Sequence, residues 1–218
     1  RRPLKTPYES HGKPVTDAPV ALDVANLGGD DFHDVSFSIR RGEVIGIAGA
    51  TSSGRIGVAE AVAGLGRYTH GAIHINDKTL RSGDVPAALA LGVGCVPKSR
   101  HKEGLVLEQS VADNTTMTIS GQLGPAGFIS PRRRTDVTNA AIDTLGVVTE
   151  GPEQLVSSLS GGNQQKVVMG RALANDPSVL VLMDPTAGVD VKSKEALLRV
   201  VENKRREGKA VLVVSGEL

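Results

Sequence analysis

Two glycines with four residues between them mark the first segment of this sequence whose residue types suggest chemistry. The segment follows a short apolar run at residues 44–48 and precedes a stretch of helical composition. Between a strand and a helix, such glycines let backbone N–H groups curve around a phosphate, and the helix dipole adds attraction. We therefore predict a phosphate-binding loop made of Gly49, Ala50, Thr51, Ser52, Ser53, Gly54, Arg55 and Ile56.

The last two positions of this phosphate loop differ from the pattern that supports nucleotide hydrolysis. In the pattern G-x-x-x-x-G-K-[ST], the lysine contacts the phosphates and the hydroxyl binds magnesium. Arg55 keeps the positive charge but has a larger, planar head. Ile56 has no atom that can coordinate a metal. Considered alone, these residues are about as compatible with an ordinary glycine-rich turn between a strand and a helix as with a phosphate-binding loop.

A second segment, which reads LSGGNQQ at residues 159–165, also has the residue types of an anion site. Ser160 is a favourable N-cap residue, and Gly161 and Gly162 expose backbone N–H groups at the start of the helix expected here. A hydroxyl, amides and a helix dipole together attract an anion. The simpler interpretation is a capped helix without a ligand. The loop before it and the apolar strand after it disfavour that interpretation.

Together these segments resemble the ABC ATPases, and the NQQ ending resembles the carbohydrate-importer branch of that family. The resemblance covers almost all of residues 21–218. It is strongest to the second ATPase half of the tandem carbohydrate-import ATPases of the ribose, galactose and xylose group. It implies that residues 159–165 are the signature, in which Ser160, Gly161, Gly162 and Gln164 face the γ-phosphate of ATP bound by an opposing ATPase half.

The same resemblance assigns further positions, several of which lack the usual side chain. Where the family has Asp then Glu, an ungapped match puts Met183 at the magnesium-binding position and Asp184 at the water-polarising one. With one residue deleted, Asp184 is instead the metal ligand. Lys98 stands at the Q-loop glutamine and Gly216 at the switch histidine. Asp190 ends the D-loop (residues 187–190), which touches the opposing half in the family; capping the next helix explains Asp190 equally well.

These departures imply an asymmetric protein. The family pairs two halves head to tail, so this chain would lend its signature to ATP held by an N-terminal half of the same polypeptide. ATP is the expected cofactor. Binding of Mg²⁺ at this half's own loop is expected to be weak or absent, and Asp184 is the candidate ligand for the metal. Transmembrane permease subunits and, indirectly, a periplasmic or extracellular sugar-binding protein are the other implied partners. The implied location is the cytoplasmic face of the membrane, as a peripheral subunit.

Composition narrows the class of protein. Lys plus Arg total 25 against 24 for Asp plus Glu, which argues against nucleic-acid binding through bulk charge, so we expect no nucleic-acid partner. Cys95 is the single cysteine, so no internal disulfide can form. We interpret it as a small buried hydrophobe. No apolar run approaches the roughly 20 residues that cross a bilayer, and no signal-peptide core is present.

The elements that must position these sites follow from the hydrophobic pattern. Alternation predicts strands near residues 22–27, 35–39 and 73–75, the last at a sheet edge. Apolar runs predict strands at 44–48, 93–96, 179–183 and 210–214, and the first is typical of a buried parallel strand. Helices are expected at 56–63, 85–91, 131–145, 162–174 and 192–206. This alternation predicts an α/β P-loop NTPase core with a mainly parallel sheet, an antiparallel β-subdomain and an inserted helical subdomain.

Three parts are expected along the chain. Residues 1–20 read as a linker from a missing N-terminal half. Residues 21–97 and 159–218 form the ATP-binding core with its antiparallel β elements, and residues 98–158 form the inserted helical subdomain. The native C-terminal tail is expected to be truncated.

Three functions remain compatible with the sequence. The first is an ATPase half that energises sugar import. The second is a non-hydrolysing nucleotide-binding or regulatory module. The third, an ABC ATPase without a transporter, is disfavoured by the NQQ ending and by the importer-like residues 103–105. The basic run at 132–134 could dock on a partner, but a solvated face explains it more simply.

Overall fold

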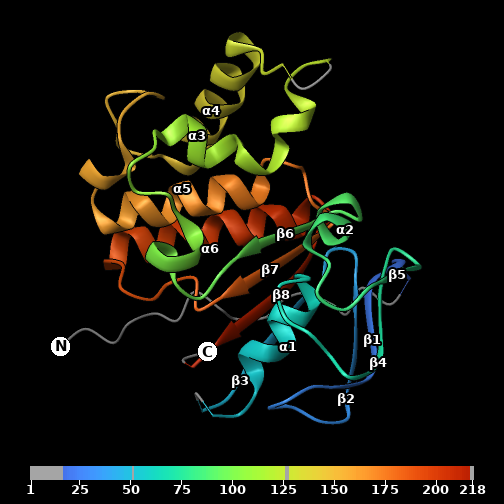
Figure 1. The fold of residues 1–218 in the computed structure, drawn as a ribbon. Helices are drawn as coiled ribbons and strands as arrows, with labels where there is room; N and C mark the ends of the chain where they lie inside the picture. Colours follow the sequence, from blue (N-terminus) through green and yellow to red (C-terminus); the bar gives the residue numbers. More distant parts are fainter. Residues whose placement is uncertain (1–16, 51, 126–127, 217–218) are drawn as a thin grey trace, which may run out of the picture.

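A parallel sheet runs through the middle of the molecule (Figure 1). The computed structural model describes residues 17–50, 52–125 and 128–216. The sheet has the strand order β3-β8-β7-β6, and its neighbours are all parallel. The strands are β3 (Val44–Ala48), β6 (Val93–Val96), β7 (Val179–Met183) and β8 (Ala210–Ser215). Each of the four apolar runs is therefore confirmed as a strand.

Strand β7 joins two hydrophobic cores, because all five of its residues are buried. Side chains alternate along a strand. Val181 and Met183 accordingly pack with α1 (Arg55–Val62) and the antiparallel sheet. Leu180 and Leu182 pack with the helices on the opposite face.

The expected antiparallel element is a separate sheet with the order β2-β1-β4-β5. Its strands are β1 (Val20–Gly28), β2 (Val35–Arg40), β4 (His70–Ile75) and β5 (Lys78–Leu80). The prediction of an edge strand at 73–75 is wrong, because β4 lies between β1 and β5. The turn residues Asn76 and Asp77 both have positive φ, which suits a tight hairpin, and β5 follows them.

Strand β3 also differs from expectation, because it is the edge of the parallel sheet and is only half-buried. Among the described residues it pairs on one side, with β8. An apolar run has the same composition at an edge and at the centre of a sheet, so the sequence pattern could not distinguish the two.

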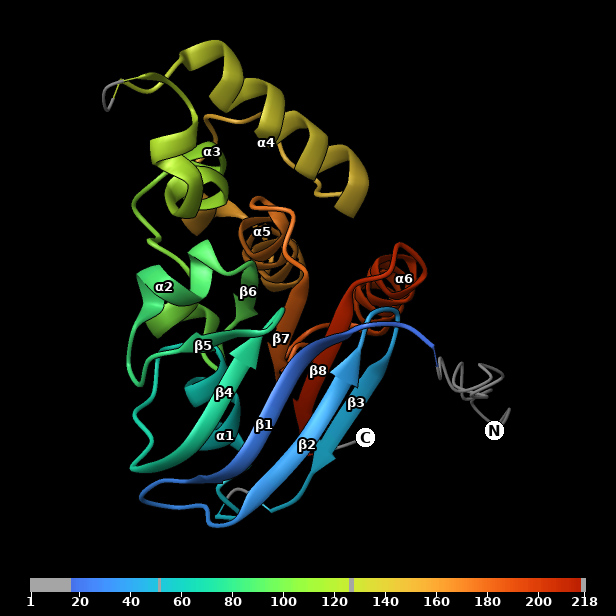
Figure 2. The same ribbon diagram turned by 90° about the vertical axis from the view of Figure 1, so that its right-hand side faces the viewer.

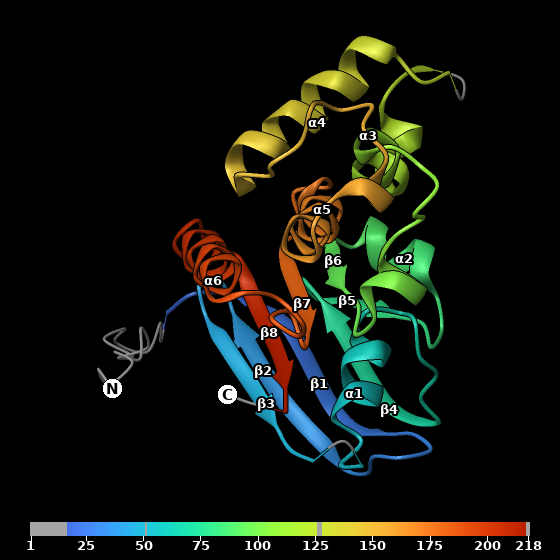
Figure 3. The same cartoon turned by 90° about the vertical axis from the view of Figure 1, so that its left-hand side faces the viewer.

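Helices cover both faces of the parallel sheet (Figure 3). Helix α1 lies between the parallel and antiparallel sheets, and α2 (Val85–Ala90) packs against β6. On the other face lie α5 (Gly161–Leu173) and α6 (Val191–Arg206). The described part of the chain contains no helix long and apolar enough to cross a membrane.

The chain between β6 and α5 consists of helices and loops in its described residues, and the longest of its helices stands beyond α5, away from the sheets (Figure 2). It contains the π-helix η1 (Arg100–Gly104), α3 (Val111–Thr116), the 3₁₀ helices η2 (Met117–Gln122) and η4 (Val156–Ser158), and α4 (Pro131–Leu145). The bounds of α4 are those expected from the sequence. Ser130 caps its start and Gly146, with positive φ, ends it.

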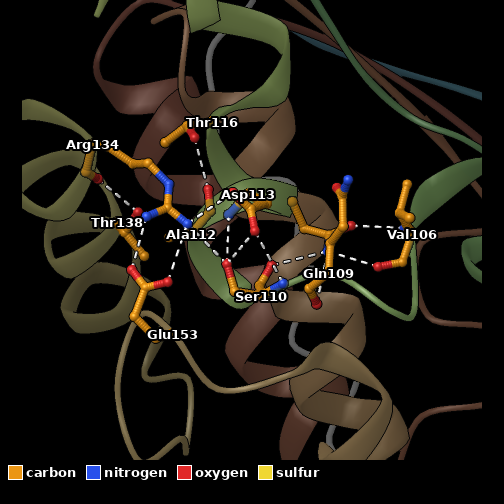
Figure 4. Close-up of polar contacts among 10 residues, drawn as sticks. Val106, Gln109, Ser110, Ala112, Asp113, Thr116, Arg134, Thr138 and Glu153 are labelled. Carbon is orange, nitrogen blue, oxygen red and sulfur yellow. Dashed lines mark hydrogen bonds and ion pairs between the residues drawn. The ribbon is translucent and has the colours of Figure 1, made fainter. Parts of the chain in front are cut away.

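The basic run at 132–134 is only partly the solvated face that we expected. Arg132 is 93% exposed, whereas Arg134 is 19% exposed. The Arg134 guanidinium binds Asp113 and Glu153, each at 2.8 Å, and also donates to Ser110 Oγ (Figure 4). This cluster ties α4 to the start of α3 and to the loop that leads into the signature.

Candidate functional site

The phosphate loop lies between β3 and α1, as expected. Gly54 has a φ of 75° and occupies the N-cap of α1 without a side-chain cap. A side chain at Gly54 would collide with the Asp31 carbonyl, so only glycine suits this position. Gly49 lies against Ser53, and the Ser53 N–H donates to the Ala50 carbonyl. Ser52 is exposed, and Thr51 lies outside the described residues.

Arg55 turns its guanidinium back onto its own chain. Its side chain is 5% exposed. Nε donates to the Gly49 carbonyl at 2.9 Å, and Nη1 lies 3.4 Å from Asp184 Oδ2. The cation of the loop is thus held by a loop carbonyl and by the carboxylate at the end of β7. A carboxylate so close to a buried guanidinium neutralises much of its charge.

Asp184 contacts two other predicted site residues, Arg55 and Gly216. Its Oδ1 accepts a hydrogen bond from the Gly216 N–H at 3.1 Å, while Oδ2 faces Arg55. The Asp184 N–H donates to the Val214 carbonyl at 2.7 Å, and its φ is 45°. Gly216 is also close to the guanidinium, because a Cβ there would lie 3.2 Å from Arg55 Nη2. The structure therefore brings Arg55, Asp184 and Gly216 together.

The remaining positions around the loop are apolar. Ile56 is half-buried and packs against the core between the two sheets, and Met183 is buried in that same core. Phe32 is buried beside Gly54 and Gly57. Asp184 is thus the carboxylate available at the end of β7. Among the described residues, no cluster of three or more His, Cys, Asp or Glu could hold a metal.

The signature lies at the start of α5. Ser160 takes the N-cap position and is exposed, but its hydroxyl does not cap the helix. Instead, Ser160 Oγ accepts from Asn163 Nδ2 at 3.2 Å. The prediction that Ser160 caps the helix is therefore right for its position and wrong for its hydrogen bond. By contrast, side-chain caps are present at the starts of α2, α3, α4 and α6.

The D-loop packs directly on the signature. Asp190 caps α6 by accepting from the Ser193 N–H at 3.0 Å and the Ser193 hydroxyl at 2.8 Å. These hydrogen bonds hold the pKa of Asp190 below its ordinary value. A Cβ on Gly162 would collide with Ser193 Oγ and lie 3.0 Å from Asp190 Oδ2, which explains the glycine. Gln165, buried, donates to the Pro185 carbonyl at 2.9 Å. The capping role of Asp190 is confirmed; its role toward an opposing half stays a prediction.

In the part of the chain that the structure describes, no hydrogen bond or ion pair joins Lys98 to Arg55, Asp184 or the signature. This lysine is exposed after β6, and its charge acts on Glu60 of α1, whose pKa is raised by burial and then by Glu103. Close by, an apolar hollow of about 400 Å³ lies between α1, α2, β6 and α5. Cys95 lines the hollow, and burial raises its thiol pKa to about 12, so it stays protonated at neutral pH.

Two residues at the signature were not anticipated from the sequence. Arg100 and His101, in η1, contact the D-loop and Gln164 respectively. Their spacing matches no phosphate-binding pattern. The one available signal was their place two and three positions after Lys98. Among the described residues, no hydrogen bond or ion pair joins the phosphate loop to the signature.

The fold and the loop between β3 and α1 define the class of protein as an α/β P-loop NTPase. The family model described as "ABC transporter" matches residues 32–187, and the chain belongs to this family. It is 40% identical over 187 residues to the ribose import ATP-binding protein RbsA of Geobacillus kaustophilus, covering 86% of this chain and 38% of that protein. It is 41% identical over 205 residues to RbsA 2 of Streptomyces coelicolor, covering 93% and 40%.

Solved structures agree on the fold. The dimeric structure of MJ0796, a bacterial ABC transporter cassette, has a TM-score of 0.77 at 20% identity and covers 90% of this chain and 88% of that one. The ADP conformation of MJ1267, an ATP-binding cassette of an ABC transporter, has a TM-score of 0.74 at 20% identity, covering 92% and 83%. At this identity the likeness shows the fold alone. The chain spans about two fifths of the length of the curated relatives that it matches.

Proposed function

We propose that this chain is the C-terminal ATP-binding cassette of a tandem ATPase that powers sugar import. In this proposal its signature completes an ATP site on the N-terminal half of the same polypeptide, and its own loop does not hydrolyse ATP. Support for the sugar comes from relatives named for ribose import. Support for a second half comes from the share of those relatives that this chain spans.

A contrast between two helix starts carries the proposal. At the start of α1, the loop cation is held by Asp184 and by the Gly49 carbonyl. At the start of α5, Ser160 is exposed and the first amides have no side-chain cap. The first amides of α1 also have no side-chain cap, and uncapped amides at a helix start attract phosphate. The two starts therefore differ in the loop cation that Asp184 and Gly49 hold, and not in their amides. The signature is therefore the better equipped of the two to act on a nucleotide.

The donor set at the chain's own loop does not fit a magnesium ion. Mg²⁺ requires oxygen ligands in octahedral geometry. Ile56 and Met183 offer none, and the carboxylate of Asp184 is already shared between Arg55 and the Gly216 N–H. We infer that Mg²⁺ binds weakly or not at all here, and that hydrolysis takes place at the site completed by the signature.

The proposed assembly follows from this division of roles. The N-terminal half would hold ATP and Mg²⁺, while transmembrane permease subunits would carry the sugar delivered by a periplasmic or extracellular binding protein. The ATPase would sit as a peripheral subunit on the cytoplasmic face of the membrane. The alternative is a non-hydrolysing regulatory module, which the Arg55–Asp184 pair also favours.

Replacing Ser160 with arginine in the full-length protein tests the proposal. The longer, charged side chain would block the helix start, so we expect ATPase activity to fall at least about tenfold, equivalent to about 1.4 kcal/mol in the barrier. Ser120→Arg, at an exposed serine of η2, is the matched control and should keep full activity. Unchanged ATPase activity in Ser160→Arg would favour the regulatory module and reject the proposed role.

A further inference from the structure

The π-helix η1 is fixed along one face of the signature helix α5. His101 Nε2 lies 2.9 Å from Gln164 Oε1. A Cβ on Gly104 would lie 3.1 Å from Val168, and Arg171 donates to the Glu103 carbonyl at 3.2 Å. Positions 164, 168 and 171 follow the spacing of a single helix face. Motion of η1 is therefore coupled to motion of α5.

Arg100, the first residue of η1, reaches from this helix to the D-loop. Its Nη1 donates to the Ala187 carbonyl at 3.2 Å and lies 3.5 Å from the Gly188 carbonyl. Its Nη2 faces the signature, since a Cβ on Gly161 would lie 3.0 Å from it. One guanidinium thus donates to the D-loop and lies beside Gly161 of the signature.

The two glycines make room for this guanidinium. Gly188 has a φ of 66°, and a Cβ there would lie 3.3 Å from Arg100 Nη1. Larger residues at either Gly161 or Gly188 would push the guanidinium away. The close approach of the D-loop, the signature and η1 therefore depends on two residues without side chains.

Arg100 is held by the carbonyl groups of the D-loop. Gln164 Nε2 donates to the Val156 carbonyl, so Gln164 Oε1 accepts and His101 must carry its proton on Nε2. The approach of Arg100 Nε to that nitrogen, at 3.3 Å, is then a contact without a hydrogen bond. No carboxylate among the described residues lies within ion-pair distance of Arg100. Its fixed points are the two D-loop carbonyls.

We propose that Arg100 is a positioning residue that holds the D-loop and the signature in register. This inference rests on the proposed function, in which the signature meets ATP on the opposing half. Arg100 need not touch that ATP. Its role is to hold Gly161 and the D-loop carbonyls at a fixed separation, so that both segments reach the opposing half together.

The expected effect falls on turnover. ATP binds mainly through the opposing half's own loop, so loss of register should leave KM nearly unchanged. Groups that act only in the closed, reacting complex contribute to kcat. A misplacement of about 1 Å at such groups can lower a rate by about 100-fold.

Steady-state ATPase kinetics of the full-length protein test this role. We expect Arg100→Gln to lower kcat about tenfold with KM for ATP changed less than about twofold. Arg100→Lys should recover part of kcat, because an ammonium can donate to a carbonyl but lacks the planar fork that spans both segments. Arg132→Gln, at a 93% exposed arginine, is the matched control and should behave as wild type.

Hydrogen exchange over residues 184–196 provides a second readout that does not depend on activity. Release of the D-loop should speed exchange there in Arg100→Gln and not in Arg132→Gln. Unchanged exchange, or a rise in KM at constant kcat, would overturn the inference. If Ser160→Arg abolishes activity while Arg100→Gln keeps wild-type kcat, the inference fails and the proposed function stands. If Ser160→Arg leaves activity unchanged, the proposed function fails, and exchange alone decides whether Arg100 holds the D-loop.

Discussion

At the scale of single residues, Arg55 shows how one substitution changes a loop. A lysine places a point charge at the end of a flexible stem, whereas arginine has a rigid fork that can bind two acceptors at once. Here the guanidinium donates to the Gly49 carbonyl and to the Asp184 carboxylate, both within the chain. Ile56, next in sequence, turns into the core. The same glycine loop therefore keeps its shape while its cation is paired within the chain and Ile56 presents no oxygen atom to a metal.

Restoring both side chains should restore magnesium dependence. In the 218-residue chain we expect Arg55→Lys with Ile56→Ser to bind ATP at least about tenfold more tightly with Mg²⁺ than with EDTA, or about 1.4 kcal/mol. The wild-type chain should show no such difference, because Asp184 remains paired. Calorimetric titration gives both affinities, with Ile56→Ser alone as the control. Tight, magnesium-dependent binding by the wild-type chain would contradict this account of the loop.

At the scale of elements, ion pairs and caps decide how the helices beyond α5 are held. Ser110 and Asp113 form a capping box at the start of α3, and Arg134 of α4 joins it. Backbone hydrogen bonds from Val111 to Gln154 and from Ala112 to Pro152 attach the loop before the signature. The position of the signature thus depends on α3 and α4 as well as on α5.

Removing Arg134 should destabilise the protein in a pH-dependent way. Burial alone would raise the pKa of Asp113, but the hydrogen bonds from Ser110 and the charge of Arg134 lower it below its ordinary 3.8. A lowered pKa stabilises the fold above pH 3.8, and this stability is lost as the pH falls through the lowered value. We expect Arg134→Gln to cost about 1–2 kcal/mol at pH 7, discounted for the exposure of Asp113 and Glu153.

Thermal unfolding at pH 7 and pH 3 checks this prediction. The difference between wild type and Arg134→Gln should shrink at pH 3, where the carboxylates begin to protonate. Arg132→Gln removes a neighbouring charge that is 93% exposed and should leave stability unchanged at both pH values. An equal difference at pH 7 and pH 3 would mean that the ion pairs contribute nothing.

At the scale of the whole molecule, β7 is shared by two hydrophobic cores. One core lies between the two sheets around α1, and the other lies between the parallel sheet and helices α5 and α6. Strand β7 contributes alternate side chains to both. Asp184 and the D-loop follow it directly, so the same strand positions the phosphate loop's carboxylate and the partner of the signature.

Shortening a β7 side chain in one core should therefore also destabilise the other core. Leu182 is fully buried on the α5 side, and Leu182→Ala should cost about 2–5 kcal/mol. Tyr68 packs against the opposite core. In urea unfolding, we expect tyrosine fluorescence and far-ultraviolet circular dichroism to shift together. Val148→Ala, at a 73% exposed side chain, should change stability by less than about 0.5 kcal/mol. Separate transitions for the two signals would show independent cores.

The amino-acid sequence alone determined the local elements and the family. The runs at 93–96 and 179–183 became β6 and β7, and the helix at 131–145 matched α4, because apolar period and capping residues act over a few neighbouring positions. The glycine spacing of the loop and the LSGGNQQ segment identified an ABC ATPase for the same reason. Each of these signals lies within a short stretch of chain.

Only the tertiary structure decided which strands lie at an edge and where the charged side chains turn. It placed β3 at the edge and β4 inside its sheet, because strand order depends on pairing between distant segments. It paired Arg55 with Asp184, 129 positions away, and laid Arg100 against the D-loop. Long side chains choose among acceptors that the fold brings near, and no local pattern in the sequence encodes that choice.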